Sequence, residues 1–395
     1  MKKLLTSLFA LILVLAGCST TDGSTDTTDA GSADVELSGS IQVAVDGGYT
    51  DYMNAMGEAF TAETGVTVEV VEADMFDILD ALPTQQGNTA DIFMLPNDRV
   101  GDLANQKLIT PVTTDLSGYT DTAVAASTFA DEQYFLPMAT DTTLFIYNKE
   151  LLDEVPASLS ELEVSDWAAK FTDFYHAGGA FMSEGGYIFG SDNADTSDLG
   201  LNNDGSVAAA EFIQSLYTSG DSTWDLMKDD TVAYDIMEQA FKDGDVKAII
   251  NGPWALAGYE EAGVDYAIAP IPSLTGNGTY SPLVGTKGLG INAYSSNVDA
   301  AQAFLAFLGT AENAQAFYDE TLEVNPHTEI AYEEGSNEAI ILEATSNGTS
   351  MPTDPAFGKV WEPMADALKQ IAAGEDAASA LDAAVETIAN DIAAM

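Results

Sequence analysis

Apolar residues in the first third of the chain alternate between a two-residue period and a helical period. The two-residue period is typical of half-buried strands, and spacings of three and four residues are typical of amphipathic helices. Strands are therefore expected at 41–45, 66–71 and 91–94, with helices at 52–65 and 74–82 between them. This order of strand and helix predicts an α/β fold with a mostly parallel sheet that is covered by helices.

The pattern becomes more helical after a further apolar, extended segment at 143–147. Gly374 separates two amphipathic stretches near the C-terminus, which predict two helices. Helices are also expected at 166–175, 207–216 and 235–241, and the apolar run 303–308 should be buried.

A short β-branched run at 246–250 predicts a buried strand that ends abruptly at Asn251-Gly252-Pro253. Trp254 follows this turn directly. In open α/β sheets, ligands bind in the crevice beyond the carboxyl ends of the strands, which makes Trp254 a candidate ligand contact. The alternative is that Trp254 is a core residue that caps a helix.

The N-terminus has the features of a secretory signal. Lys2 and Lys3 precede an apolar run at 4–16, which is too short to span a bilayer as a helix. The run ends in Leu15-Ala16-Gly17-Cys18, which resembles the bacterial lipobox. We therefore expect residues 1–17 to be removed and Cys18 to be lipidated, which anchors the protein to the outer face of the cell membrane. An ordinary secretory signal with a chance cysteine is the alternative.

Residues 18–38 are rich in Ser, Thr, Asp and Gly and cannot bury a core, so they are expected to form a disordered tether. The remaining chain is long enough for two to three domains.

Charge and cysteine content exclude several classes of function. The chain carries 64 acidic and 12 basic residues, a formal charge of −52. Such a surface repels phosphates, which argues against nucleic-acid binding. The single cysteine excludes an internal disulfide, and His176 and His327 lack the spacing of a metal site. We found no phosphate-binding loop and no hydrolase or metalloprotease motif, so no metal, cofactor or catalytic residue is expected.

Several ordered segments resemble the maltose/maltodextrin-binding proteins, the solute receptors of ABC importers. Segment 91–99 is similar to the Asp-Ile…Asp-Arg segment of that family, whose last two residues bind sugar hydroxyls. Asp141 precedes Tyr147-Asn148-Lys149 at the family's distance, and Asp173 and Tyr175 match a Glu-x-Tyr ligand pair ahead of Gly185-Gly186-Tyr187.

The second half of the chain continues the resemblance. Tyr234 lies twenty residues before Trp254, and Trp361 lies ten residues after Met351-Pro352, as in the family. Asp46, ahead of Gly48-Tyr49, matches another sugar-contacting acid. The ligand-binding residues that the resemblance implies are Asp46, Asp98, Arg99, Asp141, Asp173, Tyr175, Tyr234, Trp254 and Trp361.

Two departures put the sugar preference in question. The family's Trp in the first segment is Leu95 here, and a Lys before Gly48 is replaced by Gly47. One stacking surface and one cationic donor are therefore missing.

The chemistry of these residue types suits a sugar independently of the resemblance. Aromatic rings give apolar contact to the faces of sugar rings. Carboxylates accept hydrogen bonds from hydroxyls, and Arg99 donates. Asp98 and Arg99 are expected to be accessible at a strand-to-helix turn. For any single Asp in so acidic a chain, a solvated surface charge is the simpler explanation, and a core role for Trp361 is also credible.

The resemblance implies a two-lobed solute receptor that closes on its ligand by hinge motion. Lobe I would comprise 39–140 and 289–330, and lobe II 141–288 and 331–395, with crossings near 139–142, 284–288 and 327–331. The monomeric receptor would deliver maltodextrin-type oligosaccharides to an ABC permease. The alternatives are a secreted glycoside hydrolase that uses Asp141 and Asp173, and a receptor for another oligosaccharide, a metal or a polyamine.

Overall fold

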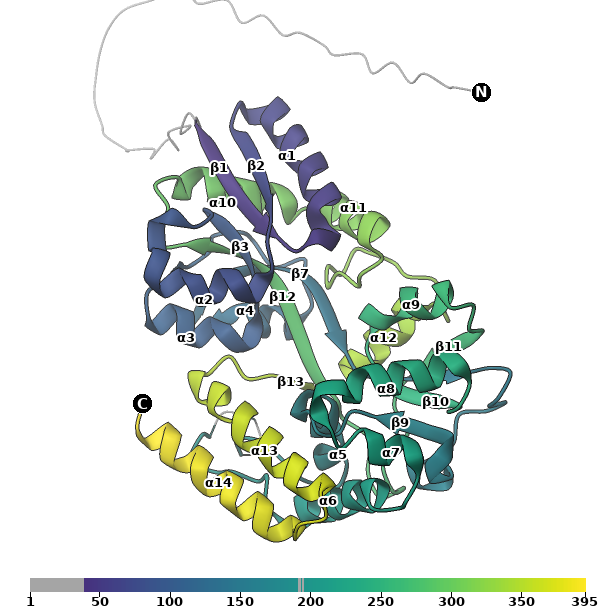
Figure 1. Cartoon of the computed structure of the whole chain (residues 1–395). Helices are drawn as coiled ribbons and strands as arrows, with labels where there is room; N and C mark the ends of the chain where they lie inside the picture. Colours follow the sequence, from purple (N-terminus) through teal and green to yellow (C-terminus); the bar gives the residue numbers. More distant parts are fainter. Residues whose placement is uncertain (1–38, 191–192, 194) are drawn as a thin grey trace, which may run out of the picture. The chain divides into compact units, whose positions relative to one another are not determined.

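The computed structural model describes residues 39–190, 193 and 195–395 of the chain. The predicted signal peptide, the lipidation site Cys18 and the tether lie outside the described residues. Two separate sheets with helices around them form the described part (Figure 1). None of the described helices has both the length and the hydrophobicity that a membrane span requires.

The larger sheet of the described residues has seven strands in the order β13-β12-β3-β1-β2, with β4 and β7 also paired to β12. β1 pairs in parallel with β2 and β3, as the sequence predicts. β12 pairs antiparallel with β3, β4 and β7, so the sheet is more mixed than expected. The strands are β1 (Ser40–Val45), β2 (Thr67–Glu72), β3 (Ile92–Pro96), β4 (Ile109–Thr110), β7 (Phe135–Thr142), β12 (Leu283–Asn292) and β13 (Thr349–Ser350).

Helices cover this sheet and begin and end where the sequence provides caps. Gly65 ends α1 in the left-handed conformation (φ 80°), which glycine adopts without strain. The Asp74 side chain accepts hydrogen bonds from the first backbone amides of α2. The helices of this part are α1 (Thr50–Thr64), α2 (Met75–Gln85), α3 (Val100–Asn105), α4 (Asp121–Ser127), α10 (Val298–Leu308) and α11 (Ala311–Thr321); a small hairpin pairs β5 (Thr128–Phe129) with β6 (Glu132–Gln133).

The smaller sheet has four strands in the order β11-β8-β10-β9, and only β9 and β10 are parallel. The prediction of a mostly parallel sheet in each lobe is therefore wrong for this sheet, because β8 pairs antiparallel with both of its neighbours. The sheet belongs to a core that includes the fully buried Trp167 and Trp224, whose rings pack edge to face at 5.3 Å. The strands are β8 (Leu144–Asn148), β9 (Trp167–Ala169), β10 (Ala248–Asn251) and β11 (Tyr266–Ala269).

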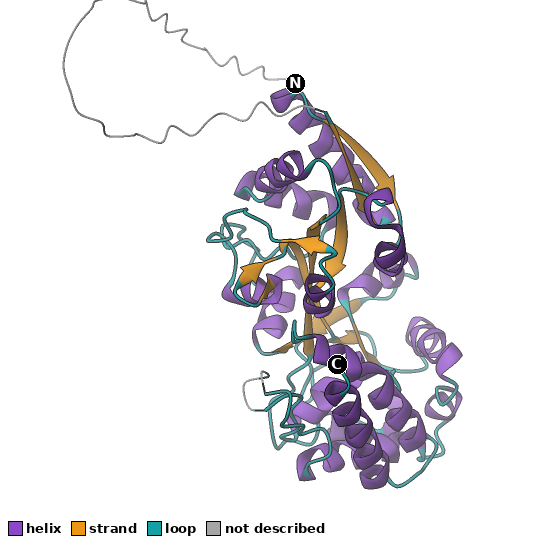
Figure 2. Cartoon of the chain, turned by 90° about the vertical axis from the view of Figure 1, so that its left-hand side faces the viewer, coloured by secondary structure: helices purple, strands orange, loops and turns teal. Residues whose placement is uncertain are grey.

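Helices again form the outer layer (Figure 2). Gly374, at φ 95°, separates α13 from α14, as predicted. The helices of this part are α5 (Phe174–Ser183), α6 (Asp204–Tyr217), α7 (Ser222–Leu226), α8 (Asp230–Asp243), α9 (Leu256–Glu261), α12 (Asn337–Ser346), α13 (Trp361–Ala372) and α14 (Ala377–Ala393).

The helix predicted at 166–175 is wrong. Residues 167–169 form β9, which pairs in parallel with β10, and α5 begins only at Phe174. Trp167, Ala168 and Ala169 are fully buried. Tertiary pairing with β10 therefore overrides the helical preference of the alanines.

Two hydrophobic cores accompany the two sheets. The first consists of two separate clusters of residues within 41–139 and 289–317. The second is a single cluster of residues within 144–283 and 341–388, with Val324 added. β7 and β12 pair along most of their length and run from one core to the other. A third segment lies beside β7, because the Asn325 side-chain amide donates to the Met138 carbonyl at 2.8 Å. The two-lobed α/β class is thus confirmed.

Candidate functional site

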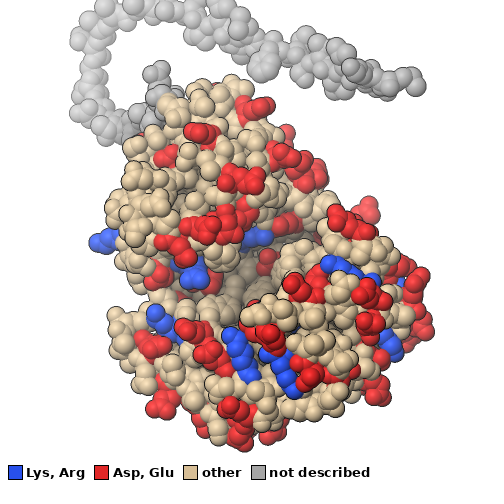
Figure 3. Space-filling view, viewed as in Figure 1, with Lys and Arg blue, Asp and Glu red and all other residues tan. Residues whose placement is uncertain are grey.

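A cavity of about 340 Å³ is lined by residues from both sheets and from the helices beside them. The space-filling view shows a hollow that is bordered by acidic and basic side chains (Figure 3). One wall of the cavity comes from β7, β12 and the segment after α11, and the other from α9, α12 and the turn η6 (Pro253–Ala255). Lining residues include Asp141, Trp254, Glu260, Lys287, Glu323 and Glu338.

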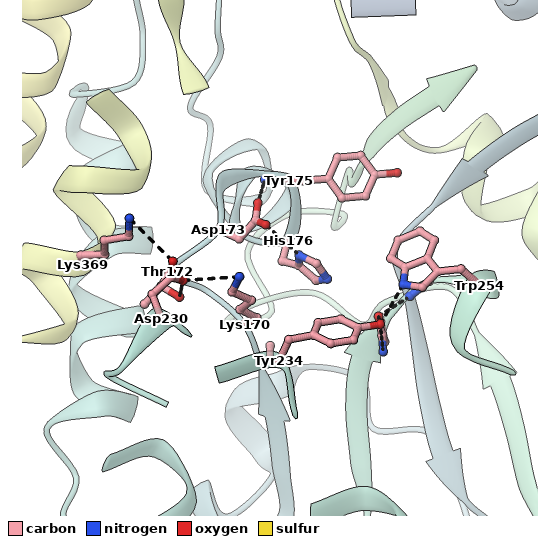
Figure 4. Close-up of polar contacts among 12 residues, drawn as sticks. Lys170, Thr172, Asp173, Tyr175, His176, Asp230, Tyr234, Trp254 and Lys369 are labelled. Atoms are coloured by element: carbon pink, nitrogen blue, oxygen red, sulfur yellow. Dashed lines mark hydrogen bonds and ion pairs between the residues drawn. The ribbon is translucent and has the colours of Figure 1, made fainter. Parts of the chain in front are cut away.

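Three predicted aromatic residues lie together beside this cavity (Figure 4). The rings of Tyr175 and Trp254 are 6.1 Å apart between centroids, and the Trp254 indole donates a hydrogen bond to the Tyr234 hydroxyl at 2.9 Å. His176 was not predicted as a site residue. Its ring centroid lies 6.3 Å from that of Trp254 and 6.5 Å from that of Tyr234. Trp254 is 48% exposed, so it is not a core residue that caps a helix.

Asp173 and Tyr175 are placed by the start of α5. The Asp173 carboxylate is the N-cap of the helix and accepts a hydrogen bond from the Tyr175 backbone amide at 2.8 Å. The Tyr175 hydroxyl donates to Asp141 on β7 at 3.0 Å. Burial and the neighbouring Asp141 raise the pKa of the Tyr175 hydroxyl, which therefore stays a donor. The structure thus brings Asp141, Tyr175 and Trp254 into one group, with Asp173 at its edge.

Asp98, Arg99 and Trp361 form a second group. Asp98 and Arg99 lie in the turn η3 (Asn97–Arg99) that follows β3, and the Arg99 Nε is 3.8 Å from Asp98 Oδ2. The Asp98 side chain is only 11% exposed, so it is less accessible than predicted, whereas Arg99 is 48% exposed. Burial raises the pKa of Asp98, although the charge of Arg99 and the neighbouring Trp361 indole lower it.

Trp361 connects this second group to the core. Its ring packs edge to face against Phe357 at 4.9 Å and against Phe174 at 6.1 Å. Because Trp361 also reaches the Asp98 carboxylate, its position fits both the binding role and the core role that the sequence left open.

Lys287 is the site residue that the sequence did not reveal. It lies on β12, and its Nζ is 3.0 Å from Glu323 Oε2 and 3.9 Å from Asp141 Oδ2. The ammonium also lies 5.3 Å from the centre of the Tyr49 ring, and the Tyr49 hydroxyl donates to Glu323 at 2.6 Å. A Lys in a β-strand has no sequence signal for this role, because its carboxylate partners are about 36 and 146 residues away in the chain.

Asp46 is connected to the site only through the charges of Lys287 and Glu323. Its Oδ1 accepts a hydrogen bond from the Met75 backbone amide at 2.8 Å. Burial raises the pKa of Asp46, while the Met75 amide and the charge of Lys287 lower it. Burial likewise raises the pKa of Asp141, against the charge of Lys287.

His176 is almost completely buried behind the aromatic rings. Neither ring nitrogen has a hydrogen-bond partner among the described residues, and Nδ1 lies 3.9 Å from Asp173 Oδ2. Burial lowers the pKa of His176, although Asp173 raises it. His176 is therefore a packing residue in its neutral form. In the part of the chain that the structure describes, no three metal-ligating side chains are arranged to hold an ion.

Another, shallower hollow of about 320 Å³ is lined by Asp173 and Trp361 among others. Asp230 is its central polar residue: it accepts from the Thr172 hydroxyl at 2.8 Å and lies 3.4 Å from Lys170 and 3.7 Å from Lys369 (Figure 4). The polar groups of this cluster are paired with one another, so the cluster is a structural link between α8 and α13.

Comparison with known proteins places this architecture in a family. The model of the family described as bacterial extracellular solute-binding protein matches residues 55–340. The chain belongs to this family. Individual relatives also confirm the resemblance to the maltose/maltodextrin-binding proteins.

Two relatives cover most of the chain. The maltodextrin-binding protein MdxE of Bacillus subtilis is 32% identical over 81% of this chain and 82% of its own length. A maltooligosaccharide ABC transporter solute-binding lipoprotein of Streptococcus pneumoniae is 30% identical over 98% of this chain and 95% of its own length.

Solved structures agree with this assignment. The maltose-binding protein MalE of Listeria monocytogenes, in complex with maltose, has a TM-score of 0.81 and 31% identity, and the match covers 90% of this chain and 98% of that one. MalX of Streptococcus pneumoniae, in complex with maltopentaose, has a TM-score of 0.82 and 29% identity, with 89% and 100% coverage.

Proposed function

We propose that this solute-binding protein captures maltodextrin-type oligosaccharides in the cleft between its lobes and delivers them to an ABC permease. The observation that carries the proposal is the half-exposed Trp254 ring beside Tyr175, whose hydroxyl contacts the Asp141 carboxylate. A stacking surface next to an acceptor is what the apolar face and hydroxyl rim of a sugar require. The relatives that bind maltodextrins, and the solved complexes with maltose and maltopentaose, support the choice of ligand.

The two departures from the family have different consequences. Leu95 is fully buried on β3, so it cannot replace the missing stacking surface. Lys287, however, places a cation at the cavity, 3.9 Å from the Asp141 carboxylate. We therefore add Lys287 to the nine residues proposed from the sequence.

The lobe limits 39–140 with 289–330, and 141–288 with 331–395, remain our proposal. The two hydrophobic cores support them, since their members divide close to these limits apart from Val324. Closure would then bend the chain at β7, at β12 and near 327–331, and β12 has a register irregularity between Lys287 and Gly288 that suits a bend.

The direct test is calorimetric titration of the purified protein with maltose, maltotriose and longer maltodextrins, with cellobiose and spermidine as comparison ligands. Tight binding of α-glucans alone is the expected result. Binding of spermidine, or of none of the α-glucans, would overturn the choice of ligand. Incubation with maltodextrin for many hours should release no shorter sugar; release would favour the glycoside hydrolase alternative.

Asp98 and Arg99 should each contribute a charge-assisted hydrogen bond to the ligand. Asp98→Asn and Arg99→Ala are therefore expected to weaken maltodextrin binding by roughly 1.5–3 kcal/mol each, the range for hydrogen bonds to charged groups. Titration calorimetry measures the effect. Lys107→Ala, on the far side of α3, serves as the control, and equal affinities in all four proteins would place the site elsewhere.

The same Asp98→Asn variant should be more stable than wild type without ligand at pH 7. Burial raises the pKa of Asp98 in the folded state. The contribution of Asp98 to the free energy of unfolding is therefore fully present below its unfolded-state pKa of about 3.9, and it is lost as the pH rises through the folded-state pKa. Denaturant unfolding at pH 7 and pH 4 should show the advantage of Asn at pH 7 shrinking at pH 4. A variant that is less stable at pH 7 would contradict this.

We also propose the lipid anchor, because a lipoprotein relative aligns over nearly the whole chain. Cys18→Ala should leave the protein unlipidated, so that it is released from cells or remains unprocessed. Two or three acyl chains on one residue give stable anchoring where one chain gives marginal binding. Membrane fractionation and intact mass measure the outcome, and an unchanged mass with full membrane retention would refute the anchor.

A further inference from the structure

Asn251 ends β10, three residues before Trp254, and its side chain is completely buried. The proposed binding function does not use this residue. Its Nδ2 donates to Glu238 Oε1 at 2.8 Å and to the Tyr259 hydroxyl at 2.9 Å, and its Oδ1 accepts from the Gly252 backbone amide at 2.9 Å. The orientation of the Asn251 amide is thus set on every side by buried partners.

The hydrogen bonds continue from Asn251 to the cleft. The Tyr234 hydroxyl donates to Asn251 Oδ1 at 3.3 Å and accepts from the Trp254 Nε1 at 2.9 Å. At the other end, Lys242 donates to Glu238 Oε2 at 2.7 Å. An unbroken chain of polar contacts therefore connects an acid–base pair on α8 with the half-exposed indole. Figure 4 shows the end of this chain, where Tyr234 meets Trp254.

Gly252 fixes the other end of the indole. Its backbone has φ −104° and ψ 175°, an extended conformation that any residue adopts. A Cβ at this position would nevertheless overlap three atoms of the six-membered ring of Trp254. Glycine is required here by the close approach of the indole and not by the backbone, so the ring is held by a hydrogen bond on its edge and by packing against Gly252.

We infer that Asn251, Tyr234 and Gly252 are positioning residues that hold Trp254 in its stacking orientation before a ligand arrives. Tyr234 then acts through Trp254 and not through a hydrogen bond from its hydroxyl to the sugar. Both polar atoms of this surface, the Trp254 Nε1 and the Tyr234 hydroxyl, are already used inside the protein. The surface therefore selects ligands by an apolar ring face, and a fixed indole has no side-chain freedom to lose on binding.

The consequence for sugar binding rests on the proposed function, but the fixed indole can be tested without ligand. Tyr234→Phe removes the hydrogen bond and keeps the ring, and Gly252→Ala displaces the indole and keeps every polar group. The Trp254 contribution to fluorescence is obtained by difference from Trp254→Phe. Acrylamide quenching and anisotropy of that contribution should show a more accessible and more mobile indole in both variants.

Two matched controls accompany these variants. Tyr187→Phe removes a hydroxyl that contacts Asp198 at 2.7 Å, outside the lining of the cavity. Gly258→Ala adds a Cβ that lies no closer than 3.5 Å to its nearest neighbour, the Lys242 Nζ. Both controls should match wild type in fluorescence and maltotriose affinity, and Gly258→Ala, which lies inside α9, should melt no lower than wild type.

For maltotriose, Tyr234→Phe should lower affinity about two- to tenfold, the fold-change that one hydrogen bond represents. Gly252→Ala should lower it about tenfold or more, because the added methyl group displaces the ring. Unchanged Trp254 fluorescence in both variants, or changed fluorescence with wild-type affinity, would overturn the inference. If Gly252→Ala does not fold, Tyr234→Phe decides alone. A wild-type protein that binds no α-glucan refutes the proposed function, while the ligand-free fluorescence still decides whether the indole is fixed.

Discussion

Trp254→Ala is expected to lower maltodextrin affinity by about 2 kcal/mol or more while the ligand-free protein keeps nearly its full stability. The indole is 48% exposed, and its single hydrogen bond goes to Tyr234. Truncation therefore removes a large contact surface for the ligand but little of the core. Loss of the hydrogen bond should cost no more than about 0.5–1.5 kcal/mol of the free energy of unfolding.

Trp361→Ala should behave differently, although the resemblance gives both residues the same role. Trp361 packs edge to face against Phe357 and Phe174, and Phe357 is fully buried. Its truncation is expected to lower the free energy of unfolding by about 3 kcal/mol, the lower end of the range for buried aromatic residues, because the ring is only partly buried. It should also weaken sugar binding, since the indole lies beside the proposed ligand-binding residue Asp98.

Both quantities have to be measured on the same samples, by denaturant unfolding without ligand and by titration with maltotriose. Trp224→Phe, at a fully buried indole that does not line the cavity, is the comparison for damage to the core alone: it should lower stability and leave maltotriose affinity unchanged. A large stability loss in Trp254→Ala with normal affinity would mean that the exposed ring is structural. Normal stability in Trp361→Ala would mean that its contacts with Phe357 and Phe174 contribute little.

The sequence predicted the elements whose signals are local. The period-two pattern at 41–45, the Gly65 cap of α1 and the Gly374 break between α13 and α14 each depend on neighbouring residues, and the structure confirms all three. The segment 166–175 failed because its conformation depends on β10, about 80 residues further along the chain. A three-residue strand carries too little periodicity to compete with the helical preference of alanine.

The candidate site likewise contains residues that the sequence predicted and residues that it did not. Resemblance at fixed spacings found the residues that the structure brings together around Trp254 and Asp98. It could not find Lys287 or Asn251, because their roles come from contacts between elements that are distant in sequence: Lys287 meets Glu323 and Asp141, and Asn251 meets Glu238. For Asn251, the one available signal was its place in the turn before Trp254.

Lys287→Met should strongly destabilise the ligand-free protein. The Lys287 side chain is 22% exposed and lies between Glu323 and Asp141, with the Tyr49 ring beneath it. Burial disfavours its charge, but the two carboxylates raise the pKa of Lys287 above its usual value, so the ammonium is fully charged at neutral pH. Its removal leaves two partly buried carboxylates close together without a counter-ion.

Breaking a buried ion pair from one side costs 3–5 kcal/mol, and partial exposure of Lys287 places the expected loss near the lower end, at roughly 3 kcal/mol. Lys149→Met is the matched control: Lys149 lies 2.5 Å from Asp265, but both side chains are about half exposed, at 48% and 60%. Such a surface pair contributes about 0–1 kcal/mol. Urea unfolding of the ligand-free proteins at pH 7 and pH 4.5 measures both variants.

The pH dependence of the stability loss distinguishes the contribution of the Lys287 charge from that of its packing. Without Lys287, the pKa of Asp141, which burial already raises, should rise further. A raised folded-state pKa gives stability that is present at low pH and lost as the pH increases, so the deficit of Lys287→Met should be smaller at pH 4.5 than at pH 7. Lys287→Arg, which keeps the charge, should retain most of the stability. A deficit that is equal at both pH values would show that the lysine stabilises the cleft by its aliphatic chain and not by its ammonium group.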